Sequence, residues 1–372
     1  MGYVVPLNVP FRQTTREARI AAAIQRFSQE RRAQSDVFWL KENAELLGIL
    51  ASTKTNVPVS ALQPLEEFYA GLGDRLAFFP QYYRFFLSLA LDLEDLGMAG
   101  DAGLRAAEWV AGQGFVLAEL SDLQRAEARR LCARRDVTLE LDDPSLDDRL
   151  RAFGSRSATF SLPNKKAAYE LTHIVFYLSE YGQRDPLLPT AFIQSLRFAG
   201  TLAFLELNID LLSEICVALR FAGSSPPEIW ENWLRAQARQ FTCEAAESGW
   251  VQDDYHPYLM ANWHALICDT GGFGLHLPVG AVAFRAPRVF ATPLRELSEG
   301  MFTLGARRRT SWATMRPMLD EILSHTSRDV ILAAAEADDF EAFFEGFARV
   351  AKPRETALHP QDGMGALSGL GS

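Results

Sequence analysis

The helical spacing of apolar residues along almost the whole chain most constrains its fold. In residues 80–96 apolar side chains recur three or four positions apart, Pro80 suits a first helical turn, and Gly97 follows the last one. Similar spacing, with similar start and stop signals, predicts further helices over residues 14–52, 60–71, 101–114, 121–135, 165–181, 188–205, 209–222, 226–247, 256–268, 311–325, 328–336 and 338–350. The chain is therefore predicted to be all-α.

The spacing of these segments also predicts how they are arranged. In the second half successive apolar segments begin about 40 to 50 residues apart, the length of a helix pair in α/α repeat architectures. We expect an array of helical hairpins that either stays open as a solenoid or closes into a toroid with a central cavity. One irregular Gly- and Pro-rich insertion, residues 269–305, interrupts the pattern and is expected to be a loop or short hairpin, with a lid as one alternative.

Composition shifts along the 372 residues predict two helical subdomains. A polar stretch at 142–164 is expected to be the linker between an N-terminal subdomain (1–141) and a C-terminal subdomain (165–350) that carries the candidate site. Residues 351–372 are rich in Gly and Ser and are expected to form a disordered tail.

Charge and cysteine content limit the partners and the compartment. The net charge of −10 argues against general affinity for nucleic acid or anionic membranes. No apolar run is long enough to span a bilayer, and the N-terminus lacks the pattern of a signal peptide. The four cysteines form no CxxC pair, as expected of reduced thiols. We predict a cytoplasmic protein without nucleic-acid or membrane partners; a homo-oligomer stays open.

One candidate functional face lies in residues 169–182. Wound as a helix, this segment aligns Tyr169, His173, Tyr177 and Glu180 on one side, apart from an apolar stripe. A histidine flanked by phenols and a carboxylate can transfer protons near neutral pH. The alternative is a core histidine that is hydrogen-bonded to a tyrosine.

A second face carries two carboxylates inside an apolar helix. Asp210 and Glu214 are four positions apart, and charges in such surroundings need a partner. Two carboxylates one turn apart can bind a divalent metal or share a proton. The structural alternative is a helix cap at Asp210 and a Glu214 that is paired with Arg197 or Arg220. The spacing matches neither an HExxH motif nor an EF-hand loop.

A third group of polar residues surrounds a helix start. Pro257 fixes that start, so that Tyr255 and His256 lie at the helix mouth, while His264 lies two turns further on among apolar residues. At the mouth, His256 would face a cavity. A capping or loop histidine is the alternative.

The order of these groups resembles that of a known family. Thr-His at 172–173, Tyr-Leu-Ser-Glu-Tyr-Gly at 177–182, Asp-Leu-Leu-Ser-Glu at 210–214 and Tyr-His at 255–256 are similar to a progression in an uncharacterised family of all-helical bacterial proteins. That family usually has Thr-Asp-Phe-Gly where this chain has Ser-Glu-Tyr-Gly, which keeps the carboxylate. The resemblance covers about residues 165–268. It implies a helical-repeat fold and the residues of a site, but supplies no substrate.

Together these patterns predict an enzyme that acts on a small, largely apolar molecule in a helix-lined cavity, by acid/base or metal-assisted chemistry. The catalytic groups, or alternatively the ligands of a divalent metal, are expected to be His173, Asp210, Glu214 and His256. The substrate-binding residues are expected to be Tyr169, Tyr177, Glu180 and Tyr255. The rival hypothesis is a non-catalytic helical scaffold or protein-binding module. The enzyme hypothesis requires these side chains to face one cavity, whereas the scaffold hypothesis does not.

Overall fold

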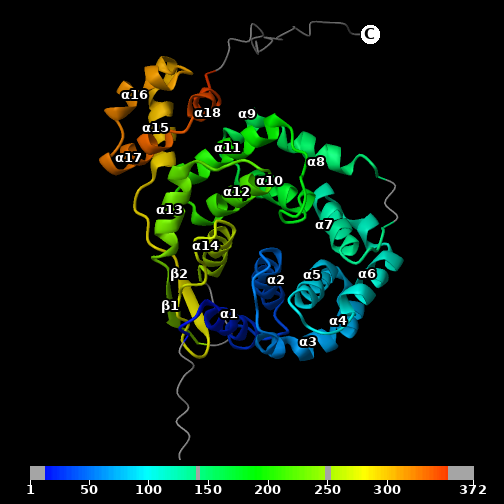
Figure 1. Cartoon of the computed structure of the whole chain (residues 1–372). Helices are drawn as coiled ribbons and strands as arrows, with labels where there is room; N and C mark the ends of the chain where they lie inside the picture. Colours follow the sequence, from blue (N-terminus) through cyan, green and yellow to red (C-terminus); the bar gives the residue numbers. More distant parts are fainter. Residues whose placement is uncertain (1–12, 140–142, 248–252, 351–372) are drawn as a thin grey trace, which may run out of the picture.

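The computed structural model describes residues 13–139, 143–247 and 253–350, and in this part of the chain the fold is all-α, as predicted (Figure 1). The β structure within these residues is one antiparallel pair of short strands, β1 (Thr242–Ala245) and β2 (Val282–Arg285). None of the helices described is long and apolar enough to cross a membrane.

The helices of the first half are α1 (Arg16–Gln25), α2 (Val37–Ser52), α3 (Glu66–Ala70), α4 (Leu72–Phe78), α5 (Tyr83–Asp95), α6 (Ala102–Gln113) and α7 (Asp122–Ala133). Those that follow are α8 (Leu146–Gly154), α9 (Ser157–Phe160), α10 (Lys165–Leu178), α11 (Thr190–Leu205), α12 (Ile209–Phe221), α13 (Glu228–Ala238), α14 (Tyr255–Ile267), α15 (Pro293–Leu304), α16 (Trp312–Asp320), α17 (His325–Ala334) and α18 (Phe340–Phe347). Most predicted helices therefore exist, with ends that shift by a few residues. The single helix predicted over residues 14–52 is wrong, because a π-helical turn (Arg26–Glu30) and a non-helical stretch separate α1 from α2, and the first half of the helix predicted over 60–71 is a 3-10 helix (Val59–Leu65).

Side-chain caps explain several of the helix starts. Asp36 accepts a hydrogen bond from a backbone N–H in the first turn of α2, Asn164 does the same for α10, and Asn208 for α12. Such caps satisfy amides that have no partner inside the helix. The three helices thus start at fixed residues, and this fixes which of their side chains face the middle of the molecule.

Six helices in the described part of the chain pack around a central space. α2 packs on α5, α5 on α7, α7 on α10, α10 on α12, α12 on α14, and α14 returns to α2 (Figure 1). α6, α11 and α13 each pack against two consecutive members of this ring. The series of packed helices therefore returns to its first member, α2, and forms a ring. A repeated hairpin unit, as the sequence suggested, stays a prediction.

One glycine allows the helices on one side of this ring to approach closely. A Cβ atom on Gly200 of α11 would lie 2.4 Å from the ring of Trp230, which is itself fully buried. We expect Gly200→Ala to lower the free energy of unfolding by about 1–3 kcal/mol, because a crowded core cannot absorb the methyl group. Urea unfolding measures this. Gly112→Ala is the control, since Gly112 has open space around it; equal midpoints for the two variants would contradict the prediction.

Residues 226–247 and the insertion 269–305 also differ from the sequence-based prediction. Strand β2, in the insertion 269–305, pairs with β1 rather than with its own neighbours, and β1 lies in residues 226–247, which were predicted to be helical. The end of the insertion is helix α15. A strand pair joined across a long stretch of sequence leaves no local signal, because four residues are too few to show an alternating pattern.

The predicted linker 142–164 also contains helices, α8 and α9, and α8 buries Leu146 and Leu150. α8 packs on α7 of the first half and on α10 and α11 of the second. The division into two subdomains stays a prediction. Residues 140–142, at the proposed boundary, and the predicted tail 351–372 lie outside the described residues.

Candidate metal centre

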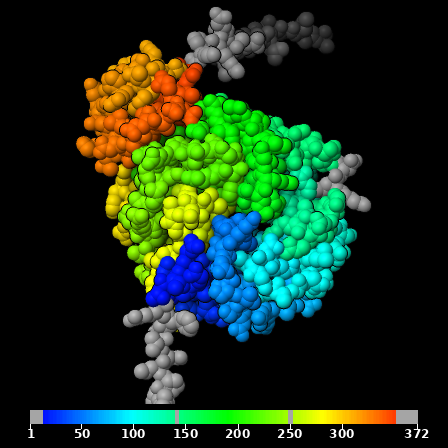
Figure 2. All heavy atoms as spheres, in the orientation of Figure 1, coloured from blue at the N-terminus to red at the C-terminus, as the bar shows by residue number. Residues whose placement is uncertain are grey.

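The ring of helices encloses a cavity of about 790 Å³, including the part that is open to solvent. Figure 2 shows a recess beside α2, where its blue surface faces the green and teal surface of the following helices. Each of the six helices supplies wall residues, among them Glu45 of α2, Ser88 of α5, Arg130 of α7, His173 of α10, Glu214 of α12 and His256 of α14.

Three of the predicted site residues meet in one group, of which Glu214 and His256 line this cavity and Asp210 lies behind them. Nε2 of His256 lies 3.1 Å from Oδ1 of Asp210 and 3.9 Å from Oε1 of Glu214. One donor atom from each of the three residues lies within 4.8 Å of the other two. Asp210 and Glu214 share a face of α12 because they are four residues apart, and the packing of α12 on α14 brings His256 to that face. The structure thus brings together two oxygen donors and one nitrogen donor.

Asp210 does not cap its helix, because Asn208 performs that role for α12. Instead, Oδ2 of Asp210 accepts a hydrogen bond of 2.6 Å from the hydroxyl of Tyr169. Oδ1 is buried and accepts no hydrogen bond from the described residues, although Nε2 of His256 is near. Burial by itself would raise the pKa of Asp210, but the interaction with His256 outweighs it and the pKa is lowered. The carboxylate is therefore ionised, with one oxygen available to a ligand.

Glu214 is only 3% exposed and has no arginine partner among the described residues. Arg197 pairs with Asp339 and Arg220 pairs with Glu231, so the expected structural partners are engaged elsewhere. A buried carboxylate without a guanidinium is costly. The Arg-paired alternative for Glu214 is therefore wrong.

The contacts of Glu214 come from α10 and from the site itself. The hydroxyl of Thr172 donates a 2.6 Å hydrogen bond to Oε2, and Nδ1 of His173 lies 3.8 Å from the same oxygen. Burial raises the pKa of Glu214; the neighbouring His173 opposes this shift and Asp210 adds to it. Glu214 thus holds its proton more readily than an exposed glutamate, unless a cation is present.

His256 is oriented by a residue that the sequence analysis missed. Its Nδ1 is 2.9 Å from Oε2 of Glu45 on α2, so the carboxylate accepts the Nδ1 proton and Nε2 faces Asp210 and Glu214. Burial alone would lower the pKa of His256, but Asp210 and Glu45 outweigh it and raise the pKa to about 11. In the absence of a metal His256 is therefore an imidazolium between carboxylates.

His173 lies at the edge of this group and lines the cavity. Its Nδ1 is 2.8 Å from the backbone carbonyl of Tyr169, which can only accept, so Nδ1 carries the proton of the neutral ring. Nε2 then keeps its lone pair. The His173 side chain is 36% exposed, which leaves this nitrogen available for proton transfer or ligation.

The remaining predicted residues do not form the expected tyrosine-lined pocket. Tyr169, Tyr177 and Tyr255 are not among the described residues that line the cavity. Tyr169 orients Asp210, Tyr177 is buried beneath Arg130, and Tyr255 packs against other aromatic rings. Glu180 does line the cavity, but it lies beyond the end of α10 and pairs with Arg130 at 2.9 Å.

Three other aromatic residues contribute to the wall. The ring centroids of Phe176 and Trp263 are 4.8 Å apart, and those of Tyr181 and Trp263 are 5.9 Å apart. The indole N–H of Trp263 is buried and has no hydrogen-bond partner among the described residues. From the sequence these residues could not be told from core residues, because a cavity wall and a packed core have the same apolar pattern.

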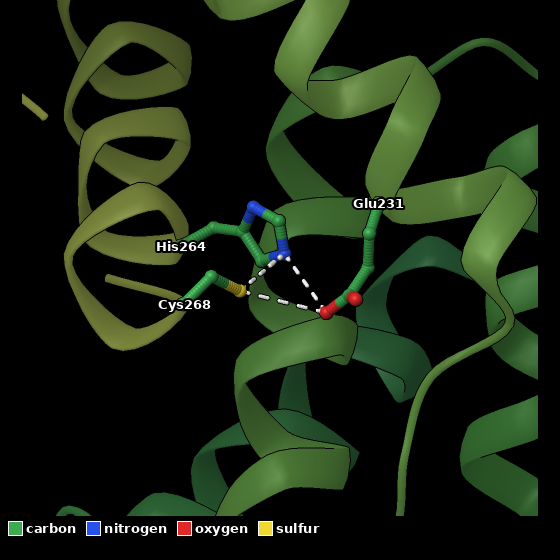
Figure 3. Close-up of side chains that lie close together, drawn as sticks. All are labelled: Glu231, His264 and Cys268. Carbon is green, nitrogen blue, oxygen red and sulfur yellow. Dashed lines mark hydrogen bonds and ion pairs between the residues drawn. The ribbon is translucent and has the colours of Figure 1, made fainter. Parts of the chain in front are cut away.

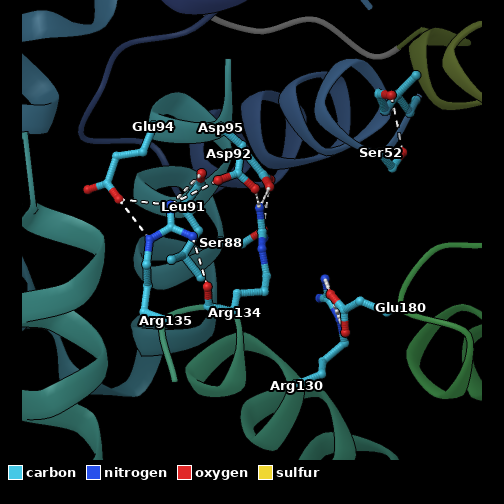
Figure 4. Close-up of polar contacts among 11 residues, drawn as sticks. Ser52, Ser88, Leu91, Asp92, Glu94, Asp95, Arg130, Arg134, Arg135 and Glu180 are labelled. Carbon is cyan, nitrogen blue, oxygen red and sulfur yellow. Dashed lines mark hydrogen bonds and ion pairs between the residues drawn. The ribbon is translucent and has the colours of Figure 1, made fainter. Parts of the chain in front are cut away.

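Another part of the cavity lining is charged (Figure 4), and its Arg130 stacks on the ring of Tyr181 at 4.6 Å. Arg134 binds Asp92 at 2.8 Å and Asp95 at 2.7 Å, while Arg130 binds Glu180. These arginines and carboxylates neutralise one another within the wall. The cavity is therefore more polar than the apolar pocket that the sequence suggested.

Comparisons with known proteins place the chain in a family but do not give it an activity. A family model described as a domain of unknown function (DUF6902) matches residues 1–350. No curated protein and no solved structure was found to match. The predicted membership of an uncharacterised helical family is thus confirmed, while the motif progression by which the sequence resembles that family stays a prediction. The chain belongs to the DUF6902 family, whose function is unknown.

Proposed function

We propose that the protein is an enzyme that binds one divalent metal ion through Asp210, Glu214 and His256 and uses it to act on a small molecule in the central cavity. The observation that carries this proposal is the convergence of three donor atoms within 4.8 Å of one another, two of them on residues that line the cavity. In a helical protein of net charge −10, a buried and a partly buried carboxylate that face the same imidazole nitrogen need a cation nearby. A metal ion is one such cation.

The outer partners of these three residues support a metal site. Glu45 accepts the Nδ1 proton of His256, Tyr169 donates to Asp210, and Thr172 donates to Glu214. Metal ligands are typically oriented in this way, with the second nitrogen of the histidine bound to a carboxylate and the ligating carboxylates hydrogen-bonded. These three contacts do not involve the atoms that face one another in the group, which are Nε2 of His256, Oδ1 of Asp210 and Oε1 of Glu214.

The donor set indicates which ions fit. Two carboxylate oxygens and one imidazole nitrogen suit Mn²⁺, Fe²⁺ or Zn²⁺, and three protein ligands leave positions open for water and substrate. A bound metal would supply Lewis-acid chemistry, by polarising a substrate oxygen or acidifying a water molecule. His173, whose Nε2 keeps its lone pair, is placed at the edge of the site to accept or donate the proton of the reaction.

The cavity wall indicates the kind of substrate. Phe176, Tyr181 and Trp263 offer a surface for an apolar or flat portion. The paired charges of Arg130, Arg134 and their carboxylate partners offer hydrogen-bonding groups to a polar portion. We infer a small molecule with both parts, rather than a wholly apolar one.

The rival proposal, a scaffold, assigns the same residues a structural role. The protonated His256 would pin α14 to α2 through Glu45 and to α12 through Asp210. In this case Asp210, Glu214 and His256 need no bound metal ion. The two proposals therefore differ in whether a metal ion displaces the proton of His256.

Titration of chelator-treated protein with Mn²⁺, followed by the electron paramagnetic resonance of the free ion, tests this difference. We expect one Mn²⁺ per chain and an affinity that rises about tenfold per pH unit between pH 6 and 8. The affinity rises with pH because the pKa of His256 is about 11 without metal, so His256 is protonated between pH 6 and 8. Each ion that binds must therefore release one proton.

His256→Gln is expected to abolish this binding and its pH dependence. His325→Gln is the matched control, because His325 is exposed and pairs with Asp329 of its own helix. An absence of Mn²⁺ binding to the wild-type protein at millimolar metal would overturn the proposal and favour the scaffold.

A further inference from the structure

A second group of donor atoms lies at the other end of α14. His264 is in the last turn of this helix, Cys268 follows that turn, and Glu231 projects toward them from α13 (Figure 3). Nε2 of His264 is 3.3 Å from the Cys268 sulfur and 3.4 Å from Oε1 of Glu231, and the sulfur is 3.5 Å from the same oxygen. The three atoms form a nearly equilateral triangle.

The size of this triangle matches the coordination sphere of zinc. Zinc lies about 2.3 Å from sulfur, about 2.05 Å from nitrogen and about 2.1 Å from oxygen, with tetrahedral angles. These values separate sulfur from nitrogen or oxygen by about 3.6 Å, and nitrogen from oxygen by about 3.4 Å. The distances between Glu231, His264 and Cys268 agree to within about 0.3 Å. The spacing of the three donor atoms is therefore that of three ligands of one tetrahedral ion.

The same geometry disfavours a nucleophilic cysteine. In a catalytic triad the carboxylate binds the imidazole nitrogen that does not face the nucleophile. Here Glu231 and Cys268 both face Nε2 of His264. In addition, burial and the nearby Glu231 raise the pKa of the Cys268 thiol to about 11, whereas an activated thiol has a lowered pKa. Three donors that share one centre suit a metal better than a proton relay.

Glu231 has the outer support that a ligating carboxylate needs. The guanidinium of Arg220 on α12 donates to its Oε1 at 2.7 Å and to its Oε2 at 2.8 Å. Burial would raise the pKa of Glu231, but His264 and Arg220 outweigh it and lower the pKa to about 2. The carboxylate is ionised and held in place before a metal arrives.

We propose that Glu231, His264 and Cys268 form a second metal site, specific for Zn²⁺ or another thiolate-binding divalent ion, with a fourth position open to water or a ligand. On binding, the Cys268 thiol loses its proton to solvent and the sulfur becomes a thiolate ligand. The site would fasten α13 to the end of α14. It differs in chemistry from the cavity site, which has no sulfur donor among its three ligands.

Cobalt spectroscopy separates the two sites, because only a thiolate ligand gives a sulfur-to-cobalt charge-transfer band in the near ultraviolet. We expect the reduced, metal-free protein to develop this band with one equivalent of Co²⁺, together with the intense visible bands of a tetrahedral ion. Cys268→Ser should remove the charge-transfer band. Glu214→Gln, which alters the cavity site, should leave it unchanged.

Cys243→Ser is the matched control, since Cys243 is also partly buried and has a similarly raised pKa but lies on β1 and belongs to no group of candidate metal ligands within the described residues. Circular dichroism verifies that each variant is folded. Independently of any variant, Zn²⁺ should protect Cys268 of the wild-type protein from alkylation, as mapped by peptide mass. Absence of the band at saturating Co²⁺, or a band that survives Cys268→Ser, would overturn this site whatever the outcome at the cavity.

Discussion

Replacing Glu214 with glutamine is expected to weaken Mn²⁺ binding in the central cavity by more than about 100-fold, beyond the loss usually caused by removing an outer hydrogen-bond partner. The amide removes one of the two negative charges that face the ion, while Asp210 and His256 remain. Glutamine keeps the volume of the glutamate side chain and one acceptor oxygen, so Thr172 can still donate its hydrogen bond. The Mn²⁺ titration measures the change in affinity.

The fold is expected to tolerate this substitution. Glu214 is buried with a raised pKa, so a neutral side chain of the same shape avoids the cost of burying a charge. The free energy of unfolding without metal should therefore stay equal or rise. Glu228→Gln on the surface of α13 is the control for the loss of one carboxylate. Marked destabilisation by Glu214→Gln together with unchanged Mn²⁺ affinity would favour the scaffold.

Arg31→Ala is expected to lower the free energy of unfolding by about 3–5 kcal/mol. The Arg31 side chain is fully buried and forms ion pairs of 2.9 Å with Glu42 and with Asp253, both of which are also buried. It donates a further hydrogen bond to the carbonyl of Val282 in β2. Removing the guanidinium takes the ion-pair partner from the buried Asp253 and leaves Glu42 paired with Arg32 alone, which costs far more than an ordinary lost contact.

The position of Arg31 explains why its replacement should affect several elements of the fold. Its partners belong to α2, to the residues just before α14 and to β2, so one guanidinium joins three elements that are far apart in the sequence. Its guanidinium also lies 5.5 Å from the ring centroid of Tyr255, the neighbour of His256. We therefore expect Arg31→Ala to weaken Mn²⁺ binding in the cavity as well, by loosening the start of α14.

Arg105→Ala is the matched control for this loss of an arginine. Arg105 also pairs with a carboxylate, Asp101, but both side chains are more than 60% exposed. Exposed pairs contribute little, so its effect should stay below about 1 kcal/mol. Urea unfolding of both variants gives the comparison, and similar midpoints would contradict the structural role assigned to Arg31.

Helical phase predicted the parts of the candidate site that depend on one helix at a time. Asp210 and Glu214 are four residues apart and therefore share a face in any α-helix. Pro257 required a helix start near His256, and α14 begins at Tyr255. These conclusions follow from local geometry, which does not depend on the rest of the fold.

The partners of these residues could not be predicted in the same way. Glu45 binds His256 from a helix more than 200 positions earlier, and nothing in its own segment distinguishes it from a surface glutamate. Thr172 was adjacent to a predicted residue, but its contact with Glu214 depends on how α10 packs on α12. Glu231 likewise reaches His264 and Cys268 only through the packing of α13 on α14.

The sequence by itself determined the all-α class, the approximate limits of most helices and the faces on which Asp210, Glu214 and His256 lie. These depend on periodicity, caps and breakers, which act over a few residues. Only the tertiary structure decided that α2, α12 and α14 meet at one cavity, that its aromatic wall is Phe176, Tyr181 and Trp263, and that β1 pairs with β2. Such contacts join distant segments, and they arise from the packing of whole helices rather than from any pattern within one segment.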